Sequence, residues 1–252
     1  MNRKNEKATL RVEGLQKRFG KKWAVKDVGF SMYSGEVVGL LGPNGAGKTT
    51  VFYMIVGFIK ATSGQIFLDE ENITHQPMYR RALRGISYLP QEPSVFRKLS
   101  VEDNIWAILE TRKDLTYEQK KDRLEELLEE FNISSIRKQL AYPLSGGERR
   151  RTEIARNLAI DPKFLLLDEP FAGIDPIAVS EIKHLVKELS NRGVGILITD
   201  HNVQHTLAIT DRSYIIHLGE ILTHGNRREI LSNPIAREIY LGQDFEMPES
   251  LN

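Results

Sequence analysis

The stretch Gly42-Pro43-Asn44-Gly45-Ala46-Gly47-Lys48-Thr49 decides the fold of this chain. It has every fixed position of the G-x-x-x-x-G-K-[ST] phosphate loop. Apolar segments flank it at Glu36–Leu40 and at about Lys48–Phe58, and we predict that the first is a strand and the second a helix. The glycines let backbone N–H groups turn toward phosphate oxygens, and the start of the helix adds positive potential. The stretch therefore predicts an α/β domain with a site for a nucleoside triphosphate.

The side chains of this loop predict how ATP and a metal ion bind. We expect the Lys48 ammonium to contact the β- and γ-phosphates and the Thr49 hydroxyl to ligate Mg²⁺. The competing interpretation is a glycine-rich turn with no ligand; the complete motif and its setting between a strand and a helix favour phosphate binding. The candidate ATP-binding residues here are Gly42, Pro43, Asn44, Gly45, Ala46, Gly47, Lys48, Thr49 and Thr50.

A second motif, Phe164-Leu165-Leu166-Leu167-Asp168, is predicted to be a buried strand that delivers a carboxylate to its C-terminal end. Nucleotides bind at this edge of open parallel sheets. Asp168 is the candidate metal ligand, directly or through water, and Glu169 is the candidate for polarising the attacking water. The alternative is a pair of acidic residues that only cap the next helix, and the phosphate loop makes that interpretation the weaker one.

The composition limits the class of protein. Hydrophobic residues make up 40% of the 252 residues and charged residues 27%, as in a soluble globular domain with a sizeable core. The formal net charge of +1 gives no global field for nucleic acid or acidic lipid, and the lack of cysteine excludes disulfides and thiolate chemistry. With a polar start and no apolar run of about 18–20 residues, we expect a cytoplasmic or peripheral protein that meets the membrane only through partners.

Hydrophobic patterning predicts a sheet with a helical insertion at roughly 92–160. After Thr116, the spacing of Leu124, Leu127, Leu128 and Phe131 is typical of one buried helix face. Capping-box patterns occur at Ser100 and Thr116. The other predicted strands are Thr9–Val12, Val25–Tyr33, Gly195–Thr199, Tyr214–Leu218 and Ile221–His224, with a turn at Ser34-Gly35 and a break at Gly219-Glu220.

The string Leu144-Ser145-Gly146-Gly147-Glu148 resembles the signature motif of the ABC ATPases, and it lies upstream of Asp168 as in that family. Ser145 and Glu148 can form a capping box for a helix predicted at Arg149–Ile160, while the two glycines leave backbone N–H groups open to an anion. A capping box without a ligand is the alternative interpretation. The flanking nucleotide motifs favour the resemblance.

The resemblance implies the fold class and the domain organisation. It extends over residues 9–242, which we expect to be a single ABC ATPase domain of the P-loop type. A RecA-like core, an N-terminal antiparallel β subdomain and a helical signature-motif subdomain at about 92–160 are implied. A short tail at 243–252 follows.

Other landmarks of the family follow in order along the chain. Gln91 looks like the glutamine that reaches the metal and the water and reports to the membrane subunit, and Ala172–Asp175 looks like the loop that crosses the dimer interface. His201 looks like the switch histidine that contacts the γ-phosphate. Phe19 stands where the family stacks an aromatic ring, often Tyr, on adenine; a role of Phe19 in the core is the alternative.

The family also implies partners. Two subunits pair head to tail around ATP, so that the residues Ser145, Gly146 and Gly147 of one complete the site of the other. This homodimer lies under two transmembrane permease subunits, at the cytoplasmic face of the inner membrane. No nucleic acid is involved.

Residues around these motifs resemble, more narrowly, the ATPase subunits of bacterial lipopolysaccharide exporters, whose permeases are of the LptF and LptG type. This resemblance rests on five stretches of the sequence: Tyr88–Asn104, Leu144–Arg151, Leu167–Gly173, Ile198–Val203 and Tyr240–Phe245. Gln243 departs from it, since an acidic residue is expected there. Other candidates are the ATPase of a branched-chain amino-acid importer, a non-transport ABC ATPase and a nucleotide-binding regulator without turnover. The chain has a single phosphate loop and no long heptad run, which argues against a non-transport ABC ATPase. The presence of both Glu169 and His201 argues against a regulator without turnover.

The short segment Ser94-Val95-Phe96-Arg97 is a candidate contact with the membrane partner. In the family, a groove near this position receives a short helix from each permease. We expect Phe96 to be an apolar anchor for that helix and Arg97 a polar contact beside it. The alternative is that Phe96 packs inside its own helical subdomain.

Overall fold

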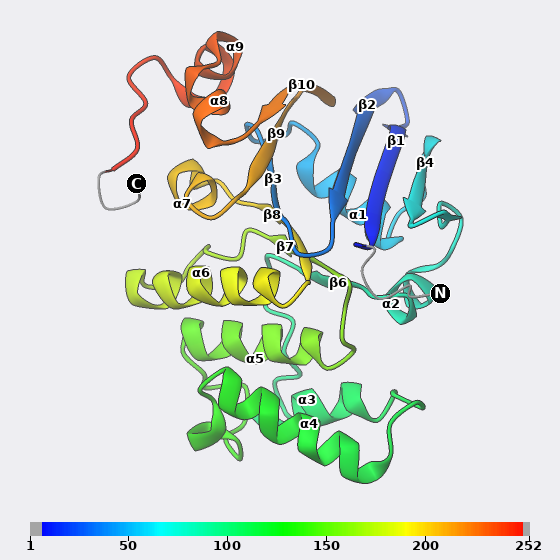
Figure 1. Cartoon of the computed structure of the whole chain (residues 1–252), viewed down its shortest axis with the longest axis vertical. Helices are drawn as coiled ribbons and strands as arrows, with labels where there is room; N and C mark the ends of the chain where they lie inside the picture. The colour runs from blue at the N-terminus through cyan, green and yellow to red at the C-terminus, as the bar shows by residue number, and fades with distance from the viewer. Residues whose placement is uncertain (1–6, 249–252) are drawn as a thin grey trace.

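The structure, a computed structural model, describes residues 7–248, so that the first six residues and the last four of the predicted tail lie outside it. These residues form an α/β fold around one mixed sheet of strand order β5-β4-β1-β2-β10-β9-β3-β8-β7-β6 (Figure 1). The strands are β1 Thr9–Phe19, β2 Lys22–Tyr33, β3 Val37–Leu41, β4 Ser63–Leu68, β5 Glu71–Asn72, β6 Ile86–Leu89, β7 Phe164–Asp168, β8 Gly195–Thr199, β9 Arg212–His217 and β10 Glu220–Gly225. The helices are α1 Lys48–Val56, α2 Met78–Leu83, α3 Val101–Leu109, α4 Tyr117–Glu130, α5 Gly146–Leu158, α6 Pro176–Asn191, α7 Val203–Leu207, α8 Arg227–Ser232 and α9 Pro234–Ala236, with a 3₁₀ turn at Ser134–Ile136 and a π-helical turn at Arg237–Leu241.

A parallel core places the candidate site. β3 pairs with β8 and β9, β8 with β7, and β7 with β6, all in parallel. Side chains along β7 alternate between two cores, with Leu165 and Leu167 on the side of α3–α6 and Phe164 and Leu166 on the side of α1. Because parallel strands end at one edge, Leu41, Asp168 and Thr199 lie together there, and the predicted buried strands are confirmed.

The N-terminal strands form an antiparallel part of the sheet, as the resemblance implies. β1 pairs with β2 and with β4, while β10 meets β2 in parallel through the pair Glu220 and Asp27. The predicted strand Thr9–Val12 is too short, because β1 continues to Phe19. Gly14, at φ 54, lies where the register with β2 shifts, and this bulge breaks the alternation that sequence patterning relies on.

The helices α3, α4 and α5 pack below the sheet in the lower part of Figure 1. Leu124, Leu127 and Leu128 of α4, with Phe131 at its end, are buried as predicted. The capping box at Thr116 is complete, whereas at Ser100 the Asp103 carboxylate accepts from the Ser100 hydroxyl and not from its backbone. α5 begins at Gly146, three residues before the predicted start, because Ser145 caps it directly.

Several elements were not predicted from the sequence, among them β4, β6 and α2. β6 has only four residues, so its pattern is too short for a periodicity. The hairpin β9–β10 was predicted, but its turn is Leu218-Gly219, both with positive φ, and Glu220 belongs to β10. Within residues 7–248, no helix combines the length and the apolar character needed to cross a membrane.

Candidate functional site

The phosphate loop lies between β3 and α1, as predicted, and backbone packing explains its glycines. Gly42 has φ 155, and a Cβ there would stand 2.0 Å from the carbonyl oxygen of Ile216. Gly47, at φ 111, would place a Cβ 2.6 Å from the carbonyl oxygen of Ala24. Gly47 is also the N-cap of α1, and no described side chain caps that helix start. The loop therefore leaves the N–H groups of the helix start for another acceptor, such as a phosphate.

Lys48 is folded into this loop. Its side chain is largely buried, and Nζ donates hydrogen bonds to the carbonyl oxygens of Gly42 at 2.7 Å and Pro43 at 3.1 Å. Burial lowers the pKa of Lys48, while the nearby carboxylates of Glu169, Asp168 and Asp200 raise it. A cation is thus held at the centre of the loop, surrounded by acidic groups.

Asp168 lies at the end of β7, close to the loop. The Tyr88 hydroxyl donates to Asp168 Oδ2 at 3.1 Å. Burial raises the pKa of Asp168, against the lowering effects of hydrogen bonds from Tyr88 and Thr49 and of the charge on Lys48. Two of the three residues predicted to hold the metal, Thr49 and Asp168, therefore come together, while the third, Gln91, donates to the neighbouring Glu169. Tyr88 was not predicted as a site residue, because in the sequence it is only the first residue of the stretch Tyr88–Asn104 that carries the family resemblance.

Glu169 and the residues around it form the second half of the site. Gln91 Nε2 donates to Glu169 Oε2 at 2.9 Å, and His201 Nδ1 lies 3.4 Å from the same oxygen. Glu169 has φ 46, in the left-handed region that non-glycine residues rarely adopt. Its backbone N–H donates to the carbonyl oxygen of Thr199 at 2.8 Å. Two candidate residues from separate segments, Gln91 and His201, thus converge on the carboxylate of a third, Glu169.

Asp200 is a buried carboxylate next to this cluster. Its side chain is fully buried and accepts hydrogen bonds from the backbone N–H groups of Phe171 at 3.2 Å and Asn202 at 2.9 Å. Burial raises the pKa of Asp200. His201 Nδ1 also lies 3.4 Å from Asp200 Oδ1, so the predicted switch histidine lies between the carboxylates of Glu169 and Asp200. The sequence offered a signal for Asp200, because this residue directly follows the buried strand β8, much as Asp168 ends the buried strand β7.

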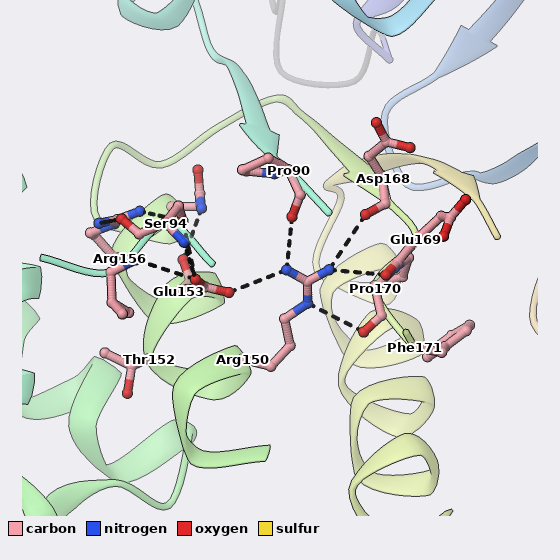
Figure 2. A network of polar contacts seen from close by, with 12 residues as sticks. Pro90, Ser94, Arg150, Thr152, Glu153, Arg156, Asp168, Glu169, Pro170 and Phe171 are labelled. Carbon is pink, nitrogen blue, oxygen red and sulfur yellow. Dashed lines mark hydrogen bonds and ion pairs between the residues drawn. The ribbon is translucent and has the colours of Figure 1, made fainter. Parts of the chain in front are cut away.

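Arg150 of α5 is a buried group that sequence analysis did not single out. Figure 2 shows its guanidinium facing the backbone that follows β7. It donates to the carbonyl oxygens of Pro170 at 3.2 Å, Glu169 at 3.2 Å and Asp168 at 3.4 Å. A further hydrogen bond goes to the carbonyl oxygen of Pro90 at 3.0 Å. In the sequence Arg150 is one of three consecutive arginines, so nothing distinguishes it from its two neighbours. Only the i, i+3 spacing to Glu153 indicates that it could form an ion pair on the helix.

The signature residues lie at the start of α5. Glu148 Oε2 accepts from the backbone N–H of Ser145 at 2.9 Å and from its hydroxyl at 2.7 Å, which completes the predicted capping box. A Cβ on Gly146 would meet the Ile174 side chain at 3.2 Å. Within residues 7–248, no hydrogen bond or ion pair joins Ser145–Gly147 to the phosphate loop. The two halves predicted to enclose ATP are thus not brought together inside one chain.

The two aromatic candidates are both exposed. Phe19 lies at the tip of the β1–β2 hairpin, where it is 51% exposed and Lys17 Nζ is 5.0 Å from its ring centre. Phe96 is 48% exposed, and Arg97 beside it is exposed as well. These exposures contradict the alternative interpretations, in which Phe19 and Phe96 are core residues.

Phe96 lines a groove of about 800 Å³, which we call the α2–α5 groove. Its walls come from α1, α2, β6, α3 and α5. Ser94, Phe96 and Arg156 are among the residues that line it.

Comparisons with known proteins agree with this geometry. The sequence model of the ABC transporter family matches residues 25–172. The chain is 52% identical over 240 residues to the lipopolysaccharide export system ATP-binding protein LptB of Escherichia coli K12, covering 95% of this chain and 100% of that protein. It is 53% identical to LptB of Haemophilus influenzae, covering 94% and 99%. A probable ABC transporter ATP-binding protein of Azorhizobium caulinodans is 57% identical, covering 95% and 85%.

Solved structures show the same fold. The ADP conformation of MJ1267, an ATP-binding cassette of an ABC transporter, superposes with a TM-score of 0.83 at 30% identity, covering 95% of this chain and all of that one. A dimeric post-hydrolysis structure of the ATP-binding cassette MJ0796, bound to ADP and Pi, has a TM-score of 0.77 at 24% identity and supports the fold alone. With the matched family, the near full-length relatives and the shared fold, this chain belongs to the ATP-binding proteins of the ABC transporter family.

Proposed function

We propose that this chain is the ATP-hydrolysing subunit of an ABC transporter that exports lipopolysaccharide. ATPase activity is general in its family. The proposal that the chain hydrolyses ATP rests on one observation: Lys48, Asp168 and Glu169 lie close together at one edge of the sheet. The lipopolysaccharide part rests on the LptB relatives, which are 52–53% identical over nearly the full chain.

The donor set at the loop fits a magnesium ion. Mg²⁺ prefers oxygen ligands and is usually held by one or two carboxylates with substrate phosphates. The Thr49 hydroxyl lies beside the Asp168 carboxylate, and the side-chain oxygen of Gln91 adds a further candidate donor. These residues would hold the ion, which when bound neutralises charge on the phosphates. The residues Gly42–Thr50 would bind the phosphates and the Phe19 ring would stack on adenine.

Glu169 is the group best placed to polarise water. Its carboxylate is partly exposed and follows Asp168 directly, while the Gln91 amide donates to it and His201 lies beside it. Glu169 would accept a proton from the attacking water and His201 would contact the γ-phosphate. The left-handed backbone at Glu169 supports this role, because strained residues that persist cluster at functional sites.

A second copy of the chain would complete the site. The N–H groups at the start of α5 lie apart from the phosphate loop of the same chain, so their phosphate must belong to a partner. Head-to-tail pairing would place Ser145, Gly146 and Gly147 against the ATP on the other subunit. Donors supplied in trans contribute roughly 10³–10⁵ in rate in other phosphate-loop enzymes.

The membrane partners would be two permease subunits of the LptF and LptG type, at the cytoplasmic face of the inner membrane. Each would insert a short helix into the α2–α5 groove, with Phe96 as its apolar anchor and Arg97 beside it. The exposure of Phe96 on that groove supports this assignment. We assign residues 9–242 to one ATPase domain, with about 92–160 as the helical subdomain and 243–252 as a tail.

Two measurements test the proposal. Phosphate release by the purified chain separates an ATPase from a nucleotide-binding regulator without turnover. Affinity purification from native membranes, with identification of the partner polypeptides and bound lipid, separates a lipopolysaccharide exporter from a branched-chain amino-acid importer or a non-transport ATPase. Amino-acid permeases as the partners, or no membrane partner, would contradict the export function.

A further inference from the structure

The backbone at Glu169 is strained, and the Arg150 side chain donates hydrogen bonds to its carbonyl groups. A non-glycine residue in the left-handed region costs about 1–3 kcal/mol and persists only where its surroundings fix it. Arg150 donates to three consecutive carbonyl oxygens there, those of Asp168, Glu169 and Pro170. Its side chain is only 6% exposed, so water does not compete for these carbonyls. Arg150 of α5 therefore holds the carbonyl groups of this turn, while the Thr199 carbonyl oxygen accepts from the Glu169 N–H.

Glu153, one turn along α5, connects Arg150 to another loop (Figure 2). Its Oε2 accepts from Arg150 Nη1 at 3.2 Å. Its Oε1 accepts from the backbone N–H groups of Ser94 at 2.5 Å and Val95 at 3.3 Å, and from the Ser94 hydroxyl at 3.3 Å. The Glu153 side chain is 2% exposed. A buried carboxylate thus ties the loop at Ser94 to the guanidinium that holds Glu169.

The loop at Ser94 is part of the α2–α5 groove. Ser94, Phe96 and Arg156 all line it. Arg156 donates to the Ser94 carbonyl oxygen at 2.8 Å and to its hydroxyl at 2.7 Å, and its guanidinium lies 5.0 Å from the centre of the Phe96 ring. A chain that fills the groove and moves Phe96 or Arg156 therefore acts on Ser94, and through it on Glu153.

We propose that Glu153 is a positioning residue that couples occupation of the α2–α5 groove to the placement of Glu169. The path runs from Ser94 through Glu153 and Arg150 to the carbonyl oxygens of residues 168–170. Glu153 touches no nucleotide atom in this scheme, and it acts on the turnover step and not on ATP binding. The inference rests on the proposed function, because it takes Glu169 as the base and the groove as the permease site.

The Glu153→Gln variant tests this in the full chain. It keeps the size of the side chain and removes the charge that pairs with Arg150. We expect kcat to fall about ten-fold or more, as when groups that orient catalytic residues are removed, with the KM for ATP changed less than about two-fold. We also expect co-purified permease subunits to change the kcat of the wild type, and this response should be lost in the variant.

Glu181→Gln is the matched control. Glu181 of α6 pairs with Arg151, the neighbour of Arg150 on α5, so this ion pair joins two helices and does not involve the loops at Ser94 or Glu169. It should keep kcat, KM and the response to the permease. If Glu153→Gln is poorly folded, the double variant Arg150→Gln with Glu153→Gln removes both buried charges together, and we expect it to restore the Tm but not kcat.

The outcomes separate the two proposals. A wild-type chain without ATP turnover refutes the proposed function, and the coupling path with it. An active wild type with an unchanged kcat and permease response in Glu153→Gln overturns the coupling path alone. So does a double variant in which kcat recovers with the Tm, because the effect would then come from an unpaired buried charge.

Discussion

Truncating Phe96 measures what the α2–α5 groove contributes to assembly. A Phe side chain buries roughly 150–250 Å² when it is fully covered. Phe96 is 48% exposed, so on the order of 100 Å² remains for a partner to cover. At about 25 cal/mol per Å² this amounts to about 2.5 kcal/mol. Phe96→Ala should therefore weaken assembly with the permease subunits about 60-fold.

The assay compares three quantities in the purified variant: the Tm, ATP turnover of the isolated chain, and co-purification with the permease. Phe96→Ala should change only the last, because half of its ring already faces solvent. Phe58→Ala is the matched control, since Phe58 is 67% exposed but does not line the groove. Normal assembly and transport in Phe96→Ala would remove Phe96 from the contact, and a joint fall of Tm and turnover would show that it supports the fold instead.

Three further predictions concern the site itself. Glu169→Gln should abolish phosphate release while ATP binding and an ATP-bound dimer persist, and near wild-type turnover would sink the assignment of the base. Lys48→Ala should weaken ATP binding, and Ser145→Arg should block the shared site; mixing the two variants should restore part of the activity, and verified heterodimers without any recovery would count against completion in trans. Tyr88→Phe removes the hydroxyl that donates to Asp168, and we expect the Mg²⁺ concentration for half-maximal turnover to rise about ten-fold. A Mg²⁺ titration that superposes on that of the wild type would exclude this role for Tyr88.

Local patterns in the sequence were enough for the elements that carry the site. The phosphate loop, the strand ending at Asp168 and the helix start at Ser145 were predicted because glycine spacing, apolar runs and caps act between near neighbours. Parallel pairing then requires that the strands end at one edge, which brings Asp168 beside Lys48. β4 and β6 were missed, since short strands carry too little periodicity.

The supporting residues were missed for a different reason. Tyr88 and Asp168 are 80 positions apart, and Pro90 and Arg150 are 60 apart. The pairing of β6 with β7 brings the first two residues together, and the packing of α5 under the sheet brings the second two together. No spacing rule in the sequence encodes either contact. Glu169 was identified from its place after Asp168, and Gln91 and His201 were identified through the family resemblance. The structure shows that both lie against the Glu169 carboxylate. Their roles in turnover, and that of Phe19, stay predictions.

The left-handed backbone at Glu169 has a consequence for the evolution of this chain. A residue with a Cβ costs about 1–2 kcal/mol in this region, whereas glycine occupies it freely. We expect both Glu169→Gly and Glu169→Gln to be inactive, and the glycine variant should melt at the higher temperature of the two. Laboratory selection for heat resistance alone, without selection for transport, should then favour loss of this glutamate, because at this position selection for turnover and selection for stability demand different residues.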